Sequence, residues 1–193
     1  MSMLILGLVI FLGVHATSIF APAWRNAQVA ARGEAVWKGG YALLSLIGLV
    51  LIVHGYGEAR GNPVALYEPP AFLRHEAWTL MLPVFPLLLA SKLPGCISAA
   101  TKHPMLVAVK LWALAHLLAN GTLASTLLFG GFLAWAVADR ISLKRRPVSA
   151  VASPAATAPP GRYNDAIAVV VGLCLYAAFL GVLHVWLIGV SPR

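Results

Sequence analysis

Apolar residues along this chain are gathered into long runs, and charged residues stand mainly in the short connectors between those runs. Six of the runs are long enough for a helix to cross a bilayer core of about 30 Å, which takes about 20 residues. We therefore predict an all-α fold, a six-transmembrane-helix bundle that forms a single domain over residues 1–193. The predicted spans are Met3–Trp24, Gly40–Tyr56, Glu76–Ala90, His103–Ala119, Thr122–Ala138 and Ala166–Val190.

Two prolines and one biased segment add detail to this plan. Pro83 and Pro86 stand inside the third run, where each removes a backbone donor and favours a kink. Residues 140–163 include an Ala- and Pro-rich stretch, RRPVSAVASPAATAPPGR, without apolar periodicity. Such composition is typical of a flexible linker, here a cytoplasmic one, with a partner-binding segment as the alternative. Asn164 or Asp165 is expected to cap the sixth helix.

The composition supports a membrane protein. Hydrophobic residues make up 60% of the chain and charged residues only 10%, whereas soluble domains average about 25% charged residues. The net charge of +8 could indicate nucleic-acid binding, but the basic residues cluster between apolar runs, as in proteins that face an anionic lipid leaflet. The expected partner is therefore the lipid bilayer and not nucleic acid. Cys96 and Cys174 lack the spacing of a disulfide framework or a zinc site.

The distribution of Lys and Arg predicts how the chain is oriented. Ten basic residues fall in the connectors after the first, third and fifth spans, and three fall on the opposite side. Because cytoplasmic loops carry the excess of Lys and Arg, both termini are expected outside the cytoplasm. The ten are Arg25, Arg32, Lys38, Lys92, Lys102, Arg140, Lys144, Arg145, Arg146 and Arg162, and the three are Arg60, Arg74 and Arg193.

Two histidines are expected near the middle of the bilayer. His15 lies about ten residues before the cytoplasmic end of the first span, which is about 15 Å deep at 1.5 Å per residue. His116 lies thirteen residues after His103, which starts the fourth span from the same side, so it is about 19 Å deep. A buried imidazole can simply bond to a backbone carbonyl or a hydroxyl. Two imidazoles at matching depth on different helices can also hold haem iron, here as haem b because no CxxCH attachment motif is present.

The remaining polar residues of the spans allow further hypotheses. Lys110 is a charge inside the fourth span, where it can extend to the cytoplasm or pair with a haem propionate. Three histidines, His54, His75 and His184, are expected on the outer side of the membrane, with Glu58, Glu68 and Glu76 near them in sequence. They could form a second, outer metal or proton-relay site, or simply bond to water, headgroups and helix ends. His103 is expected at the cytoplasmic edge.

Three stretches of the chain carry a family resemblance. FLGVHATSIFAPAWR in the first span, TKHPMLVAVKLWALAHLLANG in the fourth and LHVWLIGVSP near the end resemble the NnrU family of bacterial membrane proteins. The resemblance runs over essentially the whole chain, and it implies a multi-pass protein of the bacterial inner membrane. That family is named for a role linked to nitrite and nitric oxide reduction. It is similar in turn to 15-cis-zeta-carotene isomerase of plants and cyanobacteria, an integral membrane enzyme with haem b.

The resemblance to the isomerase assigns roles to individual residues. The isomerase's two haem-ligand histidines fall on His15 and His116, and its segments around two further histidines resemble VHGYG and LRHEAW, which contain His54 and His75. The plant enzyme has a cysteine three residues before the fourth-span histidine, where this chain has Ala113. A ligand exchange that uses this cysteine is therefore not expected here.

Three hypotheses for function follow. The first is a haem b protein with bis-histidine ligation that acts in redox chemistry or sensing linked to denitrification, with a denitrification enzyme as a partner. The second is a haem-dependent cis–trans isomerase of a polyene or another lipidic substrate. The third is a cofactor-free assembly or scaffold protein whose histidines only bond between helices.

Overall fold

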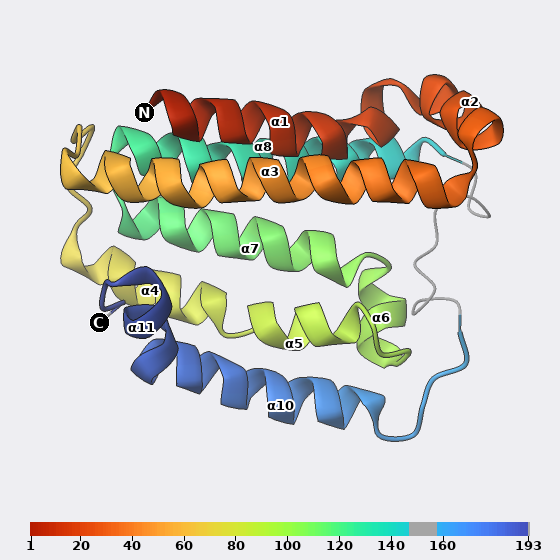
Figure 1. Ribbon diagram of the computed structural model, residues 1–193. Helices are drawn as coiled ribbons and strands as arrows, with labels where there is room; N and C mark the ends of the chain where they lie inside the picture. Colours follow the sequence, from red (N-terminus) through yellow and green to blue (C-terminus); the bar gives the residue numbers. More distant parts are fainter. Residues whose placement is uncertain (147–157, 193) are drawn as a thin grey trace. The chain divides into compact units, whose positions relative to one another are not determined.

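The computed structural model of the chain describes residues 1–146 and 158–192, and these residues are almost entirely helical (Figure 1). An isolated β-bridge between Ala65 and Thr122 is the one strand-like pairing in the described part. The all-α prediction is therefore confirmed. The chain divides into two compact units, and each is described here by itself. Unit 1 comprises Met1–Glu68 and Asn120–Lys144, and unit 2 comprises Pro69–Ala119 and Arg145–Arg193.

Unit 1 is built on a tight pairing of two long helices. It contains α1 (Ser2–Phe20), α2 (Pro22–Arg32), α3 (Glu34–Gly61) and α8 (Leu123–Lys144). A Cβ atom on Gly7 would lie 2.6 Å from the backbone N of Ile52, and one on Gly48 would lie 2.8 Å from the backbone N of Phe11. Glycine thus lets the backbones of α1 and α3 touch, which is how helices associate where lipid provides no hydrophobic driving force.

Unit 2 is assembled around a broken helix. It contains α4 (Ala71–Met81), α5 (Val84–Ala90), α6 (Cys96–Thr101), α7 (Pro104–Ala119), α10 (Asn164–Ala178), a π-helical turn η2 (Phe179–Leu183) and α11 (His184–Ile188). Val84, Leu87 and Ala108 form its small buried core, with Trp112 packed against it. Gly172 of α10 contacts the backbone of Pro86, so α10 packs closely on α5. The segment α5 therefore contacts both α7 and α10.

Asp165 caps a helix other than its own. Its carboxylate accepts hydrogen bonds from the backbone N–H groups of Cys96 (2.7 Å) and Ile97 (3.0 Å), at the start of α6. The neighbouring Asn164 donates its side-chain amide to the carbonyl of Pro94 at 2.7 Å. Because the first N–H groups of a helix have no partners within it, a carboxylate stabilises them well. The prediction that one of these side chains caps the sixth helix was wrong, since Tyr163 is the N-cap of α10 and no side chain caps it.

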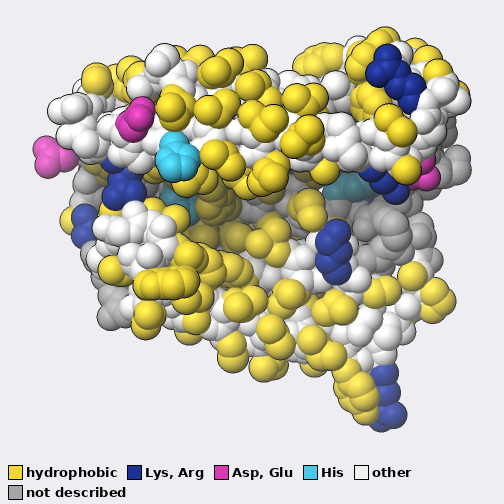
Figure 2. Space-filling model, viewed as in Figure 1, with side chains coloured by type: hydrophobic (Ala, Val, Ile, Leu, Met, Phe, Trp, Pro, Cys, Tyr) yellow, Lys and Arg dark blue, Asp and Glu magenta, His cyan; other side chains and the backbone are white. Residues whose placement is uncertain are grey.

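Four helices are long and apolar enough to cross a membrane, namely Ser2–Phe20, Glu34–Gly61, Leu123–Lys144 and Asn164–Ile188. The shorter apolar helix Pro104–Ala119 matches the predicted fourth span. Large hydrophobic side chains are exposed along these helices, such as Val53 at 62% and Val170 at 60%, and Figure 2 shows many of them on the surface. These helices therefore suit contact with lipid.

Several boundaries differ from the predicted ones, and the second span is the longer helix Glu34–Gly61 rather than Gly40–Tyr56. The first span ends at Phe20 rather than Trp24, because Pro22 cannot donate a hydrogen bond and disfavours helical geometry at Ala21. The third run is divided into α4 and α5 at Pro83, as its prolines predicted. In the predicted linker 140–163, residues 140–144 belong to α8, and residues 147–157 lie outside the described part.

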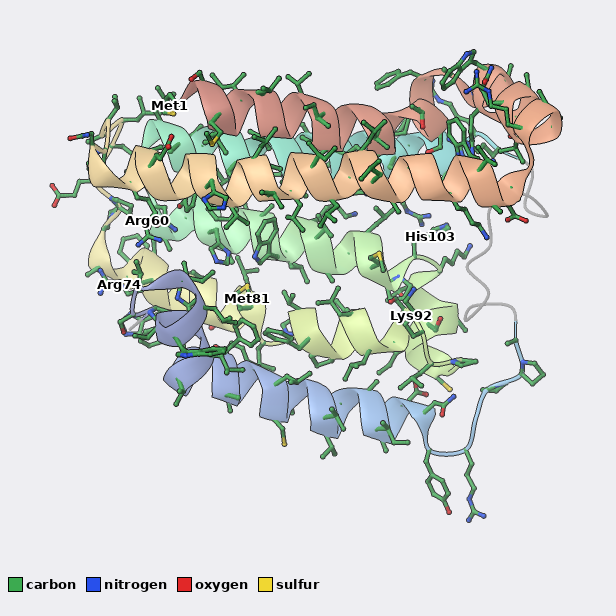
Figure 3. The ribbon with its side chains drawn as sticks, viewed as in Figure 1. Met1, Arg60, Arg74, Met81, Lys92 and His103 are labelled. Atoms are coloured by element: carbon green, nitrogen blue, oxygen red, sulfur yellow. The ribbon has the colours of Figure 1, made fainter. Side chains whose placement is uncertain are left out.

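The residues labelled in Figure 3 show, for each unit, which residues lie at the same end of the helices. Within unit 1, Met1 and Arg60 lie at the same end, because α1 and α3 run antiparallel. Within unit 2, Arg74 lies at one end, and Lys92 and His103 lie at the other, with Met81 between them. In each unit, residues that the sequence analysis placed on one side of the membrane thus share an end.

Candidate functional site

His15 lies in the interior of unit 1, on the face of α1 that contacts α3. Its Nδ1–H donates a hydrogen bond to the carbonyl of Phe11, one turn earlier, at 2.7 Å. The imidazole stacks on the Phe11 ring, with centroids 4.2 Å apart and planes inclined by 22°. Tyr41 of α3 (5.1 Å) and Trp135 of α8 (5.8 Å, edge-on) complete an aromatic enclosure. The three main helices of unit 1 therefore all contribute to the surroundings of His15.

The close contact of α1 and α3 at Gly7 and Gly48, here called the glycine seam, explains the position of His15. Gly7 and Phe11 contact α3 at Gly48, and His15 follows Phe11 by one helical turn on the same face. On the antiparallel α3, Tyr41 precedes Gly48 by two turns and so meets His15. The seam that brings the backbones together thus also fixes the position of the imidazole.

Two buried polar groups of unit 1 have no hydrogen-bond partner in the described part of the chain. One is Nε1–H of Trp135, whose ring is edge-on to His15, and the other is the hydroxyl of Ser45 on α3. Ser45 follows Tyr41 by one turn and precedes Gly48 by three residues, so it lies on the same face of α3 as both. Buried polar groups are nearly always satisfied, so each of these two groups can bond to an added polar group.

His116 lies on α7 in unit 2 and repeats the hydrogen bond of His15. Its Nδ1–H donates to the carbonyl of Trp112, one turn earlier, at 2.8 Å. The rings of the two residues lie 5.4 Å apart. Ala113 and Ala115 beside it are almost fully buried, at 0% and 1% exposure, because α7 packs against both α4 and α5. His116 is thus held on a well-packed helix.

His184 belongs to the same unit as His116. Nδ1–H of His184 donates to the carbonyl of Val190 at 2.7 Å, and His184 directly follows the π-helical turn η2. A π-helical turn is often found at functional sites, because it rotates the residues that follow it. Nothing in the apolar run around Gly181 indicated this turn, so sequence reasoning missed it.

The outer histidines are distributed over both units. His54 is an exposed residue of α3 in unit 1. In unit 2, the ring of His75 lies 4.9 Å from that of Trp78, whose Nε1–H donates to the carbonyl of Pro192 at 2.8 Å. Among the described residues, no three His, Cys, Asp or Glu side chains are grouped so that they could hold a metal ion.

Lys110 is half-buried on α7, six residues before His116. No ion pair of Lys110 is found among the described residues. A charged side chain in this position needs either a path to water or an anionic partner. Its ammonium group is therefore available to an anion.

The histidine geometry fits an axial haem ligand. A carbonyl oxygen only accepts hydrogen bonds, so Nδ1 carries the proton in His15 and in His116. In a neutral imidazole the lone pair is then on Nε2, which is the atom that binds iron. A carbonyl bond of this kind also fixes the orientation of the ring. Each of the two side chains, taken by itself, is therefore a suitable haem ligand.

Comparison with known proteins identifies a family. The family model described as NnrU protein matches residues 3–192. No curated protein and no solved structure matches the chain.

Proposed function

The chain belongs to the NnrU family, and on that premise we propose that it is an integral membrane haem b protein. His15 and His116 are the two axial ligands of the iron, and the protein acts in redox chemistry or sensing linked to nitrite and nitric oxide metabolism. It crosses the bacterial inner membrane six times, with both termini outside the cytoplasm. The observation that carries the proposal is the hydrogen bond that both histidines share, from Nδ1–H to the carbonyl one turn earlier.

This shared hydrogen bond makes a specific contribution. It keeps each imidazole in the tautomer that presents Nε2, so no proton has to leave before a metal is bound. It also raises the basicity of the ligand, because the carbonyl stabilises partial positive charge on the ring. Phe11 and Trp112, which provide the carbonyls, also contact the rings of the two histidines.

Haem supplies an iron centre that changes oxidation state, and the residues around it control its surroundings. Tyr41, Phe11 and Trp135 contact the ring of His15 and restrict its orientation, which favours defined ligation. Lys110 pairs with a propionate, which gives this half-buried ammonium an anionic partner.

Six crossings are supported by helix lengths and by the basic residues. Besides the four long helices, α7 has 16 residues and so a length of about 24 Å, and α4 with α5 spans Ala71–Ala90. Short spans of this kind are accommodated by thinning of the bilayer or by packing against neighbours. The excess of Lys and Arg on one side then sets the orientation.

The absorption spectrum of the purified protein tests the proposal. We expect a Soret band and, after reduction with dithionite, the sharp split visible bands of six-coordinate low-spin haem. A pyridine haemochrome assay identifies the group as haem b. A protein that is folded by circular dichroism but stays colourless, even after expression with added haem precursor, overturns the proposal.

A further inference from the structure

The helix α2 has two different faces. At 100° per residue, Ala23, Trp24, Ala27, Ala30 and Ala31 fall on one side of Pro22–Arg32. Arg25, Gln28 and Arg32 fall together on the other side. A helix with an apolar and a basic face is the kind that lies flat in a membrane interface.

In the described part of the protein, Trp24 contacts Trp37 of α3, and the rest of the apolar face of α2 is left exposed. No residue of α2 is buried, and the five residues of its apolar face are all exposed. Trp24 is 52% exposed, and Phe20, at the end of α1, is 79% exposed. The residues of α2 that are partly covered are Gln28 and Val29, which lie off that face. Most of the apolar face is therefore exposed and can contact lipid or another molecule.

The position of α2 places this face at the surface of a membrane. It connects α1 and α3, which are both long and apolar enough to span a bilayer, and it lies where α1 ends and α3 begins (Figure 1). Gly33, with φ of +85°, makes the tight turn from α2 into α3. An 11-residue helix between two such spans cannot be far from the headgroup region.

Aromatic residues at the end of α1 and the start of α3 also indicate a position in the headgroup region. Trp24 of α2 and Trp37 of α3 contact each other edge to face across the Gly33 turn, with centroids 5.6 Å apart. Phe20 is one turn before Trp24. Trp at the end of a span is typical of the interface, where the apolar ring and the polar N–H both find partners.

The positive charge of α2 and the start of α3 favours contact with anionic lipid. Residues 22–38 carry three basic side chains, Arg25, Arg32 and Lys38, and one acidic one, Glu34, which gives a net charge of +2. Glu34 forms its ion pair with Lys38 at 2.8 Å, and the charge of Arg25 acts on it more weakly, so the segment keeps an excess of positive charge. Figure 2 shows basic side chains directly beside hydrophobic ones over α2.

From these observations we propose that α2 lies in the membrane interface and binds anionic phospholipid headgroups through Arg25 and Arg32. Its alanine face and Trp24 are in contact with the acyl chains. A face of alanines with one tryptophan can sink to a shallow depth in lipid. The arginines then extend to phosphate groups, which they bind by paired hydrogen bonds.

Spin labels on the full chain test the depth of α2. In a background with Cys96→Ser and Cys174→Ser, single cysteines are introduced as Ala27→Cys, on the apolar face, or Asn26→Cys, 100° around the helix. The labelled proteins are reconstituted into phosphatidylcholine vesicles with 30% phosphatidylglycerol. We expect the Ala27 label to collide more with oxygen than with a water-soluble nickel complex, and the Asn26 label to show the reverse. Equal access of nickel to both labels overturns the proposal and leaves the face to a soluble partner or a second copy.

The role of the arginines is tested in the same system. We expect the Ala27 label to lie deeper with phosphatidylglycerol than in phosphatidylcholine alone, and Arg25→Gln with Arg32→Gln to remove this difference. Arg60→Gln, which removes a charge at the other end of α3, is the matched control and should keep it. A lipid dependence that survives the double substitution, or that Arg60→Gln removes equally, contradicts binding by α2.

Discussion

Replacing Gly48 by alanine is expected to force apart the seam that positions His15. The new Cβ would lie 2.8 Å from N and 3.0 Å from Cα of Phe11, and these are backbone atoms that cannot rotate away. Ordinary contact begins at 3.4 Å, so α1 has to move by at least 3.4 − 2.8 = 0.6 Å. Overpacking of this kind costs about 1–3 kcal/mol.

A matched variant isolates that cost. Gly57 lies on the same helix, and a Cβ there would meet nothing within 4 Å. Both substitutions gain the helix propensity of alanine, which is about 1 kcal/mol, so this gain cancels in the comparison. For a chain of 193 residues we expect Gly48→Ala to unfold about 2–12 °C below Gly57→Ala, by thermal circular dichroism in detergent. Equal midpoints would refute the close contact of α1 and α3.

Three further predictions test other parts of the account. Asp165→Ala should speed amide hydrogen exchange at Cys96 and Ile97 because it removes their acceptor, whereas unchanged exchange would exclude this cap. His184→Ala should keep six-coordinate haem in the absorption spectrum, since both proposed ligands, His15 and His116, remain. Loss of haem there, with haem kept after replacement of His15, would show that the ligand pair is wrong. A phosphatase reporter fused after Arg193 should be active only outside the cytoplasm, and a cytoplasmic signal would reverse the topology.

Sequence reasoning succeeded where one local cause decides the structure. The long apolar runs predicted the helical fold, and Pro83 predicted the break between α4 and α5. The hydrogen-bond need of a buried imidazole predicted that a carbonyl or a hydroxyl would take one nitrogen of His116, and the carbonyl of Trp112 does so.

Features that depend on contacts between distant parts of the chain could not be predicted from the sequence. Asp165 has the residue type and position of a cap for its own helix, yet the start of α6 comes closer, and no local pattern reveals that. The amphipathic α2 was hidden inside a predicted span and its basic connector, because Pro22 was not recognised as the end of the first helix. Trp135 and Tyr41 come from distant parts of the chain, so their contacts with His15 emerge only with the packing of unit 1.

The ferric absorption spectrum of ligand-deleted variants tests the central proposal most directly. His15→Gly and His116→Gly each remove one axial nitrogen, and His103→Gly, at the start of α7, is the control. We predict that each of the first two variants loses haem or binds it as five-coordinate high-spin haem, and that added imidazole restores the low-spin spectrum. The control should keep the spectrum of the unmodified protein. Six-coordinate low-spin haem in both His15→Gly and His116→Gly without added imidazole would contradict the assignment of these two ligands.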